Sequence, residues 1–207
     1  MKVVIIMQQN KIKLIQTVSK TNGGLIKTSE LREIGISSRK IKELLELHII
    51  NRIKYGHYML TEETAKVSDI ELAAKLIPHG VICLFTAIEH HELSTVNPTA
   101  ICIALPRDIS IPLLPKTPNI KIYRMTSKHF ELGITETDFN GTSVRIFDVE
   151  KTVCDCFKYD KDIEKAVALE ALKNYITKGN CNVQKLLEYA KIMGKKKTII
   201  PYVEALI

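Results

Sequence analysis

The stretch ISSRKIKELLELHIINRIKYGHYML, residues 36–60, decides the fold of the first third of the chain. Serines near its start can cap a helix, and later residues recur at the i, i+3, i+4 and i+7 spacing of one helical face. These residues are Ile41, Leu44, Leu45 and His48, the last expected to pack or to act at the helix C-terminus. Two extended runs, 50–54 and 57–60, then flank Tyr55-Gly56 and predict a β-hairpin.

Two further helices are predicted before this stretch. Apolar residues three apart between residues 12 and 18 predict the first, which ends at Asn22-Gly23-Gly24. Thr28 or Ser29 can cap a second helix of about two turns, which Gly35 stops. Three helices followed by a hairpin indicate a winged helix-turn-helix.

The positive charge of the chain lies almost entirely in this first part. The 207 residues carry a net charge of +7 and are 45% apolar, which is ample for a packed core. Residues 1–67 hold 12 Lys and Arg against 6 Glu, whereas residues 68–207 hold 18 basic and 17 acidic side chains. This asymmetry predicts a basic module, 1–67, joined to a nearly neutral one, 68–207. A polyanionic partner is favoured, although a solvated basic surface and a protein-docking module remain alternatives.

The order of elements places the candidate DNA contacts in the first turn of the third helix and at the hairpin. A helix in the major groove contacts base edges with its N-terminal residues, while neighbouring basic groups hold phosphates. Arg39, with Ser38, is the candidate base reader because a guanidinium fork matches guanine. Ser37 is expected only to cap the helix. The candidate DNA-binding residues are Ser38, Arg39, Lys40, Lys42, Arg52, Lys54, Tyr55 and His57.

The second module is predicted to be an α+β domain with a small β-sheet and a helical C-terminal tail. Helices are expected over residues 68–77, 81–93, 148–159, 163–177, 182–193 and 198–206. Strands are expected over residues 99–105, 120–124, 130–134 and 142–146, with a turn at Asn140-Gly141. The fold class of the whole chain is therefore α+β.

Four segments form a pattern that extends over nearly the whole chain, from about residue 8 onward. They are residues 35–60, Leu84-Phe85-Thr86-Ala87 with His90, the strand before Pro106, and the most specific, Ile146-Phe147-Asp148-Val149-Glu150-Lys151-Thr152-Val153-Cys154-Asp155. In this pattern the chain resembles the AbiEi antitoxins of type IV toxin–antitoxin systems, which are associated with abortive phage infection.

The resemblance implies a division of labour between the two modules. In that family the winged helix binds inverted repeats of double-stranded DNA in the promoter of its own operon and represses it. The C-terminal domain opposes a toxin that resembles a nucleotidyltransferase, without a stable toxin–antitoxin complex. The positions that match the DNA-binding part are Ser38, Arg39, Lys40, Lys42, Arg52 and Lys54. The resemblance assigns no antitoxic role to any residue of the second module.

We predict that the chain is not an enzyme and has no catalytic residue, metal or cofactor. Asp148, Glu150 and Asp155 could suggest a metal site, but they fit a helix cap and first turn better. Adjacent His90 and His91 point about 100° apart on a helix, which does not suit a metal site. The nucleotidyltransferase pattern fails because the spacing from a Gly-Ser turn to a pair of acids is too short.

Two further observations predict a cytoplasmic protein that does not contact a membrane. The five cysteines are odd in number and irregular in spacing, which is typical of reduced thiols. The apolar run at residues 3–7 is too short for a signal-peptide core, and no stretch approaches the roughly 20 residues of a membrane span. A ligand-sensing transcription factor without a toxin, and a nucleic-acid-directed enzyme, stay open as alternative functions.

Overall fold

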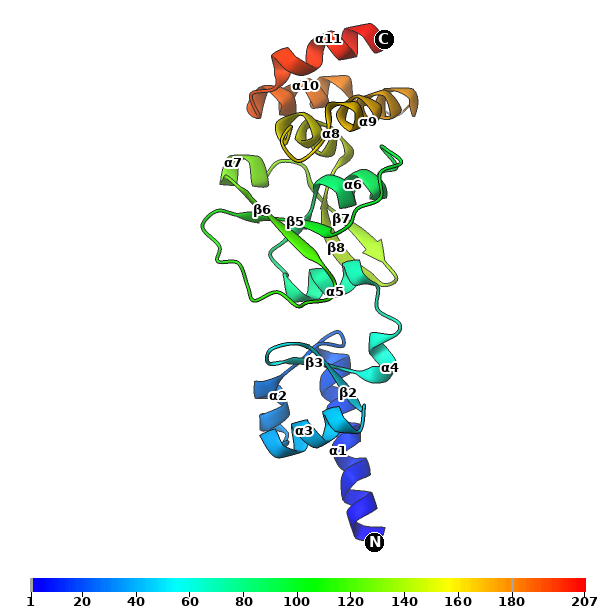
Figure 1. The fold of residues 1–207 in the computed structure, drawn as a ribbon, viewed down its shortest axis with the longest axis vertical. Helices are drawn as coiled ribbons and strands as arrows, with labels where there is room; N and C mark the ends of the chain where they lie inside the picture. The colour runs from blue at the N-terminus through cyan, green and yellow to red at the C-terminus, as the bar shows by residue number, and fades with distance from the viewer. Residues whose placement is uncertain (1, 180) are drawn as a thin grey trace. The chain divides into compact units, whose positions relative to one another are not determined.

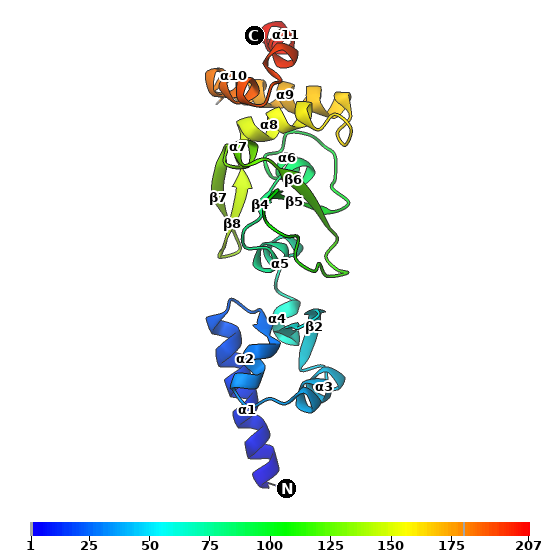
Figure 2. The same ribbon diagram turned by 90° about the vertical axis from the view of Figure 1, so that its left-hand side faces the viewer.

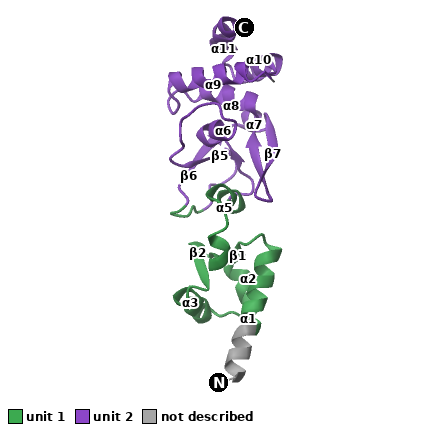
Figure 3. Ribbon diagram, turned by 90° about the vertical axis from the view of Figure 1, so that its right-hand side faces the viewer, with its two compact units in different colours: residues 1–76, 113–117 green, residues 77–112, 118–207 purple. Residues whose placement is uncertain are grey.

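The computed structural model of this chain describes residues 2–179 and 181–207, with side chains from residue 10 onward. The fold is mixed α+β and divides into two compact units (Figure 3). Unit 1 comprises the residues up to Leu76 together with Leu113–Thr117, and unit 2 comprises Ile77–Pro112 and Pro118–Ile207. The division therefore falls after Leu76 and not at 67/68, where the composition changes.

Unit 1 contains the three helices and the hairpin that the sequence predicts (Figure 1). Its elements are α1 (Lys2–Thr21), β1 (Ile26–Lys27), α2 (Thr28–Glu33), α3 (Ser38–Glu46), β2 (Ile50–Lys54), β3 (His57–Leu60), α4 (Thr61–Thr64) and α5 (Asp69–Leu76). The strands form an antiparallel sheet in the order β1-β3-β2. One core joins helices and sheet, and its buried residues are Ile15, Ile26, Leu31, Ile36, Ile41, Leu44, Ile50, Tyr58 and Leu60.

Unit 2 is built on a five-stranded mixed sheet. Its strands are β4 (Val81–Ile82), β5 (Ile101–Pro106), β6 (Ile120–Met125), β7 (Ile134–Phe139) and β8 (Thr142–Phe147), in the order β6-β5-β4-β8-β7. The pairs β5/β6 and β4/β8 are parallel, and the pairs β4/β5 and β7/β8 are antiparallel. The β7–β8 hairpin turns at Asn140 and Gly141, whose φ angles of 50° and 84° suit the predicted Asn-Gly turn.

Six helices of the described residues accompany this sheet in unit 2, and four of them follow it in the chain. They are α6 (Leu84–His90), α7 (Ser127–Phe130), α8 (Val149–Lys158), α9 (Lys165–Thr177), α10 (Val183–Ile192) and α11 (Lys196–Leu206). Figures 1 and 2 show α8 to α11 gathered on one side of the sheet. Helix α8 lies at the centre of this group, because it contacts α6, α9 and α10 and sends Val153, Cys154, Cys156 and Phe157 into the core.

Three local predictions are wrong. The helix expected over 81–93 begins only at Leu84, since Val81 and Ile82 form the central strand β4. The strand expected over 130–134 is wrong because Phe130 ends helix α7 and the strand begins at Ile134. Neither Thr28 nor Ser29 caps α2: Lys27 is its N-cap, and the Lys27 amide donates to the Glu30 carboxylate at 2.7 Å.

None of the helices in the part of the chain that the structure describes combines the length and apolar composition that a membrane crossing requires.

Candidate functional site

Helix α3 is fixed at its start by a serine cap and along one side by the core of unit 1. The Ser37 hydroxyl accepts a hydrogen bond from the Lys40 amide at 3.3 Å, as predicted for an N-cap. Ile41 and Leu44 are buried, so the helix cannot rotate without exposing them. The opposite side, which carries Arg39 and Lys42, is left to solvent.

The end of α3 is fixed by a backbone motif at His48. This residue is exposed and has a φ of 52°, so it lies beyond the helix and does not pack on the core as the spacing suggested. Its amide donates to the Leu45 carbonyl at 3.1 Å, and the Ile49 amide donates to the Leu44 carbonyl at 2.9 Å. This pair of bonds is a Schellman motif, in which glycine usually takes the left-handed position. His48 therefore ends α3 through its backbone, and a role of its side chain at the helix C-terminus stays a prediction.

The hairpin tip is tied to the start of α2. The Gly56 carbonyl accepts hydrogen bonds from the Thr28 amide at 2.9 Å and from the Thr28 hydroxyl at 3.3 Å. Gly56 itself has a φ of 73°, a left-handed conformation that favours glycine. Next to it, the Tyr55 side chain is 82% exposed. Strand, turn and helix together hold an aromatic ring out at the tip.

A groove of about 510 Å³ lies between α3, the end of α2 and this hairpin. We call it the basic groove, and its lining residues are Thr28, Arg32, Ser38, Ile41, Lys42, Arg52, Tyr55, Gly56 and Tyr58. Three of these side chains are cations, and no carboxylate is among the described residues that line the groove. The Arg52 guanidinium lies 5.8 Å from the centre of the Tyr58 ring, so an aromatic face supports one of the cations.

Four of the predicted DNA-binding residues line the basic groove: Ser38, Lys42, Arg52 and Tyr55. Arg32 and Thr28 also line it, although the sequence argument did not include them. The Arg32 guanidinium donates to the Ser38 hydroxyl at 3.5 Å and so links α2 to the first turn of α3. A basic residue in the last turn of the preceding helix was the signal that could have found Arg32.

The other four predicted residues lie outside the groove. Arg39 is on the solvent side of α3, where its side chain is 93% exposed and its nearest ion pair, with Glu43, is long at 3.9 Å. Lys40 instead extends toward α1, so it does not belong to the surface for which it was predicted. A bulge in β2 between Arg52 and Lys54 shifts the register, and burial lowers the pKa of the Lys54 amine. The His57 ring contacts the Tyr55 carbonyl.

In unit 2, the predicted acids Asp148 and Glu150 form a cluster with side chains from α9 and α10. The Lys185 amine lies 2.9 Å from both the Asp148 and the Glu150 carboxylates. Burial alone would lower the pKa of Lys185, but its hydrogen bonds to these two carboxylates raise it. The Tyr175 hydroxyl donates to Glu150 at 3.1 Å, and the Tyr189 hydroxyl to Asp148 at 3.3 Å.

Asp148 also caps α8, as the sequence predicts, by accepting a hydrogen bond from the Lys151 amide at 2.8 Å. The third acid, Asp155, is fully buried together with Lys151. The Lys151 amine lies 2.6 Å from both Asp155 carboxylate oxygens and 4.2 Å from the centre of the Phe147 ring. Burial raises the pKa of Asp155, and the Lys151 charge opposes this rise. These polar groups therefore hold α8 in place.

The cysteines and histidines of the described residues form no obvious reactive centre. All five cysteines are free, and burial raises the pKa of the Cys154 and Cys156 thiols, which keeps them protonated and unreactive. Within residues 2–179 and 181–207, no group of three or more His, Cys, Asp or Glu side chains is placed to hold a metal ion.

His91 gives unit 2 a pH dependence. Its Nε2 lies 2.7 Å from the Phe147 carbonyl. Burial lowers the pKa of His91 below the usual 6.5, and His90 lowers it further, while the bond to Phe147 and the charges of Asp148 and Glu150 oppose this shift. The unfolded chain therefore binds more protons between that lowered pKa and 6.5. We expect stability to be full above pH 6.5 and to fall as the pH drops toward the folded pKa.

Urea denaturation of the full chain between pH 5 and 7 measures this effect. His91→Gln is expected to remove a slope of at most about 1.4 kcal/mol per pH unit from the free energy of unfolding. His79→Gln is the control, because His79 is an exposed histidine of the same unit and does not contribute to the pKa shift of His91. Equal slopes in the two variants would show that His91 does not carry the effect.

Comparison with known proteins gives a likeness of fold. No protein-family model and no curated protein sequence matches the chain. The fold is similar to the crystal structure of the RV2827C protein from Mycobacterium tuberculosis, with a TM-score of 0.59 and 11% sequence identity. The match covers 86% of this chain and 69% of that one. At this identity the similarity concerns the fold alone.

Proposed function

We propose that unit 1 is a winged-helix module that binds double-stranded DNA. The observation that carries the proposal is the basic groove, which Arg32, Lys42 and Arg52 line together without a lining carboxylate, and in which Lys42 has only a long ion pair with Glu46, at 3.7 Å. A backbone phosphate is the ligand that such a set of cations suits, because each phosphate neutralised releases condensed counterions. The exposed side of α3, which lies next to the basic groove of the protein, would enter the major groove of the DNA.

Arg39 and Tyr55 would add contacts on either side of the groove. Arg39 stands in the first turn of α3, is 93% exposed and is held only by a long ion pair, so its fork is free to meet a base edge. Tyr55 stands at the hairpin tip, where an exposed ring can lie against a sugar or a base. Lys40 is left out of this interface because it extends toward α1.

We further propose that the chain is an AbiEi-like antitoxin that represses its own operon and opposes a nucleotidyltransferase-like toxin. The support is the resemblance at residues 146–155 together with the DNA-binding proposal. In this motif Asp148, Glu150, Lys151 and Asp155 all take part in the ion pairs around α8. The motif would then be a structural signature of unit 2, with the antitoxic activity elsewhere on its surface.

A gel shift with DNA from the promoter of the chain's own operon tests DNA binding. Wild-type protein is expected to shift this DNA in preference to a scrambled sequence. Arg39→Ala combined with Lys42→Ala is expected to abolish the preference, since it removes a base contact and a phosphate contact. An unchanged shift by this double variant would show that the surface on α3 is not the interface.

The same double variant separates repression from antitoxicity. In cells that express an adjacent nucleotidyltransferase gene, the variant should lose promoter repression and still restore growth when it is supplied from an independent promoter. Loss of growth rescue at equal protein level would contradict the division of labour between the units. The absence of a nucleotidyltransferase gene beside this one would favour a transcription factor without a toxin.

A further inference from the structure

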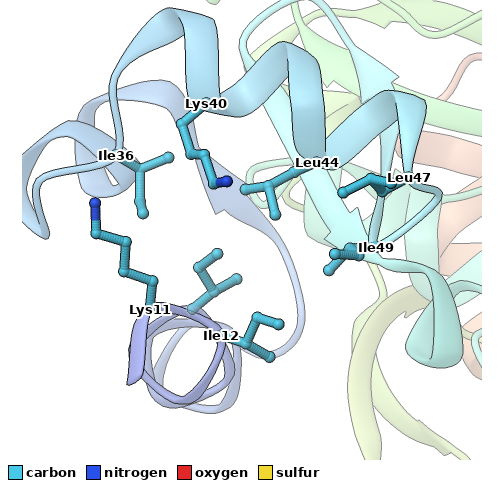
Figure 4. Close-up of a pocket in the computed structure, with 8 residues that line it drawn as sticks. Lys11, Ile12, Ile36, Lys40, Leu44, Leu47 and Ile49 are labelled. Atoms are coloured by element: carbon cyan, nitrogen blue, oxygen red, sulfur yellow. The ribbon is translucent and has the colours of Figure 1, made fainter. Parts of the chain in front are cut away.

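A second site lies on the other side of α3, between this helix and α1. It is a pocket of about 90 Å³ in unit 1. Six aliphatic side chains line it, among them Ile12 of α1, Ile36 just before α3 and Leu44 within α3. Figure 4 shows Lys11 from α1 and Lys40 from α3 extending across the space between the two helices. The pocket therefore combines an apolar interior with two cations at its margin.

The charges at this pocket are not balanced. Lys40 donates to the Glu43 carboxylate at 2.7 Å, but none of the ion pairs in the described part of the chain involves Lys11. Glu43 is itself on the solvent side, with a side chain that is 42% exposed. An anion at the margin of the pocket could thus pair with the Lys11 amine, and it would share the Lys40 amine with Glu43.

The interior of the pocket favours an apolar group, because its walls are aliphatic. Aliphatic walls without a partner forfeit dispersion contacts, and moving an alkyl chain from water into such a space is favourable. Leu47, at the edge, is 60% exposed, so part of the lining faces solvent without a partner. We propose that this pocket binds a small carboxylic acid anion, with its alkyl chain among the aliphatic residues and its carboxylate between Lys11 and Lys40.

The size of the pocket limits the ligand. Pockets for drug-sized molecules have about 300–1,000 Å³, and an apolar cavity of about 150 Å³ takes benzene. A pocket of about 90 Å³ therefore suits a short alkyl chain. A second copy of the chain is a poor occupant, because a symmetric contact would bring its Lys11 and Lys40 against these two lysines.

Methyl NMR of the full chain tests the site directly. We expect butanoate to shift the methyl signals of Ile12, Ile36 and Leu44 and to bind about tenfold more tightly than 1-butanol, because only the carboxylate carries a charge that pairs with the two amines. Butylammonium, which carries the opposite charge, should bind more weakly than either. Shifts confined to residues outside the pocket, or the same affinity for butanoate and 1-butanol, would overturn the proposal.

Charge variants then locate the carboxylate. Lys11→Gln combined with Lys40→Gln is expected to weaken butanoate binding about tenfold, to the level of 1-butanol, and to leave 1-butanol binding nearly unchanged. Lys13→Gln combined with Lys20→Gln makes the same change of net charge at exposed positions of α1 and should have no such effect. Equal affinities in the two double variants would show that the lysines do not hold the anion.

Discussion

Replacing Lys151 with Met is expected to destabilise the chain by about 3–5 kcal/mol, because it leaves a buried carboxylate without its partner. Lys151 and Asp155 are both fully buried, and the amine lies 2.6 Å from both carboxylate oxygens. Met keeps most of the volume and the contact with the Phe147 ring, so the cost comes from the charge and not from a cavity. Urea denaturation followed by circular dichroism measures it.

The double variant Lys151→Met with Asp155→Leu is the decisive control. It removes both charges, and buried ion pairs replaced by apolar residues often cost little or nothing. We therefore expect the double variant to be more stable than the single one. A double variant as unstable as Lys151→Met would indicate that shape, and not charge, causes the loss.

The loss in Lys151→Met should also depend on pH. Burial raises the pKa of Asp155 above its usual 3.8, and the positive charge of Lys151 limits this rise. Without that charge the folded-state pKa rises further, so the folded variant takes up a proton at a pH where the unfolded chain has none. Its stability should then fall as pH rises from 3.8 through the folded pKa, and the variant should be closest to wild type in acid.

Replacing both Lys42 and Arg52 with Ala is expected to lower DNA affinity by about 100-fold. Both side chains line the basic groove, and each is expected to make one charge-assisted contact with a phosphate. The loss should be nearly the same for operator and scrambled DNA, since phosphates carry no sequence information. The slope of log affinity against log salt should become less steep by about 2.

Lys13→Ala combined with Lys20→Ala is the matched control for this prediction. These exposed lysines of α1 give the same change in net charge and do not line the basic groove. Fluorescence anisotropy with labelled DNA at several salt concentrations measures both variants. If the two double variants lose equal affinity, only the net charge of unit 1 matters and the groove makes no specific contact.

Features set by neighbouring residues could be predicted from the sequence. The Ser37 and Asp148 caps and the Asn140-Gly141 turn depend on a side chain and a few backbone groups beside it, and all three are confirmed. The three helices and the hairpin of unit 1 follow from hydrophobic period and glycine placement in the same way. The α+β class follows from these elements.

Features set by distant pairing could not be predicted in this way. Val81 and Ile82 form a strand because β5 pairs with them on one side and β8 on the other, and neither neighbour is visible in the local sequence. The last-turn position of Arg32 marked it as a candidate, but its bond to the Ser38 hydroxyl depends on how the fold places α2 relative to α3. The direction of the Lys40 side chain, in contrast, could have been predicted, because Lys40, Leu44 and Leu47 share one helical face at i, i+4 and i+7.

The bonds from Thr28 to Gly56 have a consequence for any molecule that meets the basic groove. Because the amide and the hydroxyl of one residue converge on the tip carbonyl, the hairpin has already lost its conformational freedom when the chain folds. Binding of a ligand at the basic groove would then cost less conformational entropy, because the hairpin is already ordered. Thr28→Val keeps the amide and removes the hydroxyl, so it would shift part of that ordering from folding to binding.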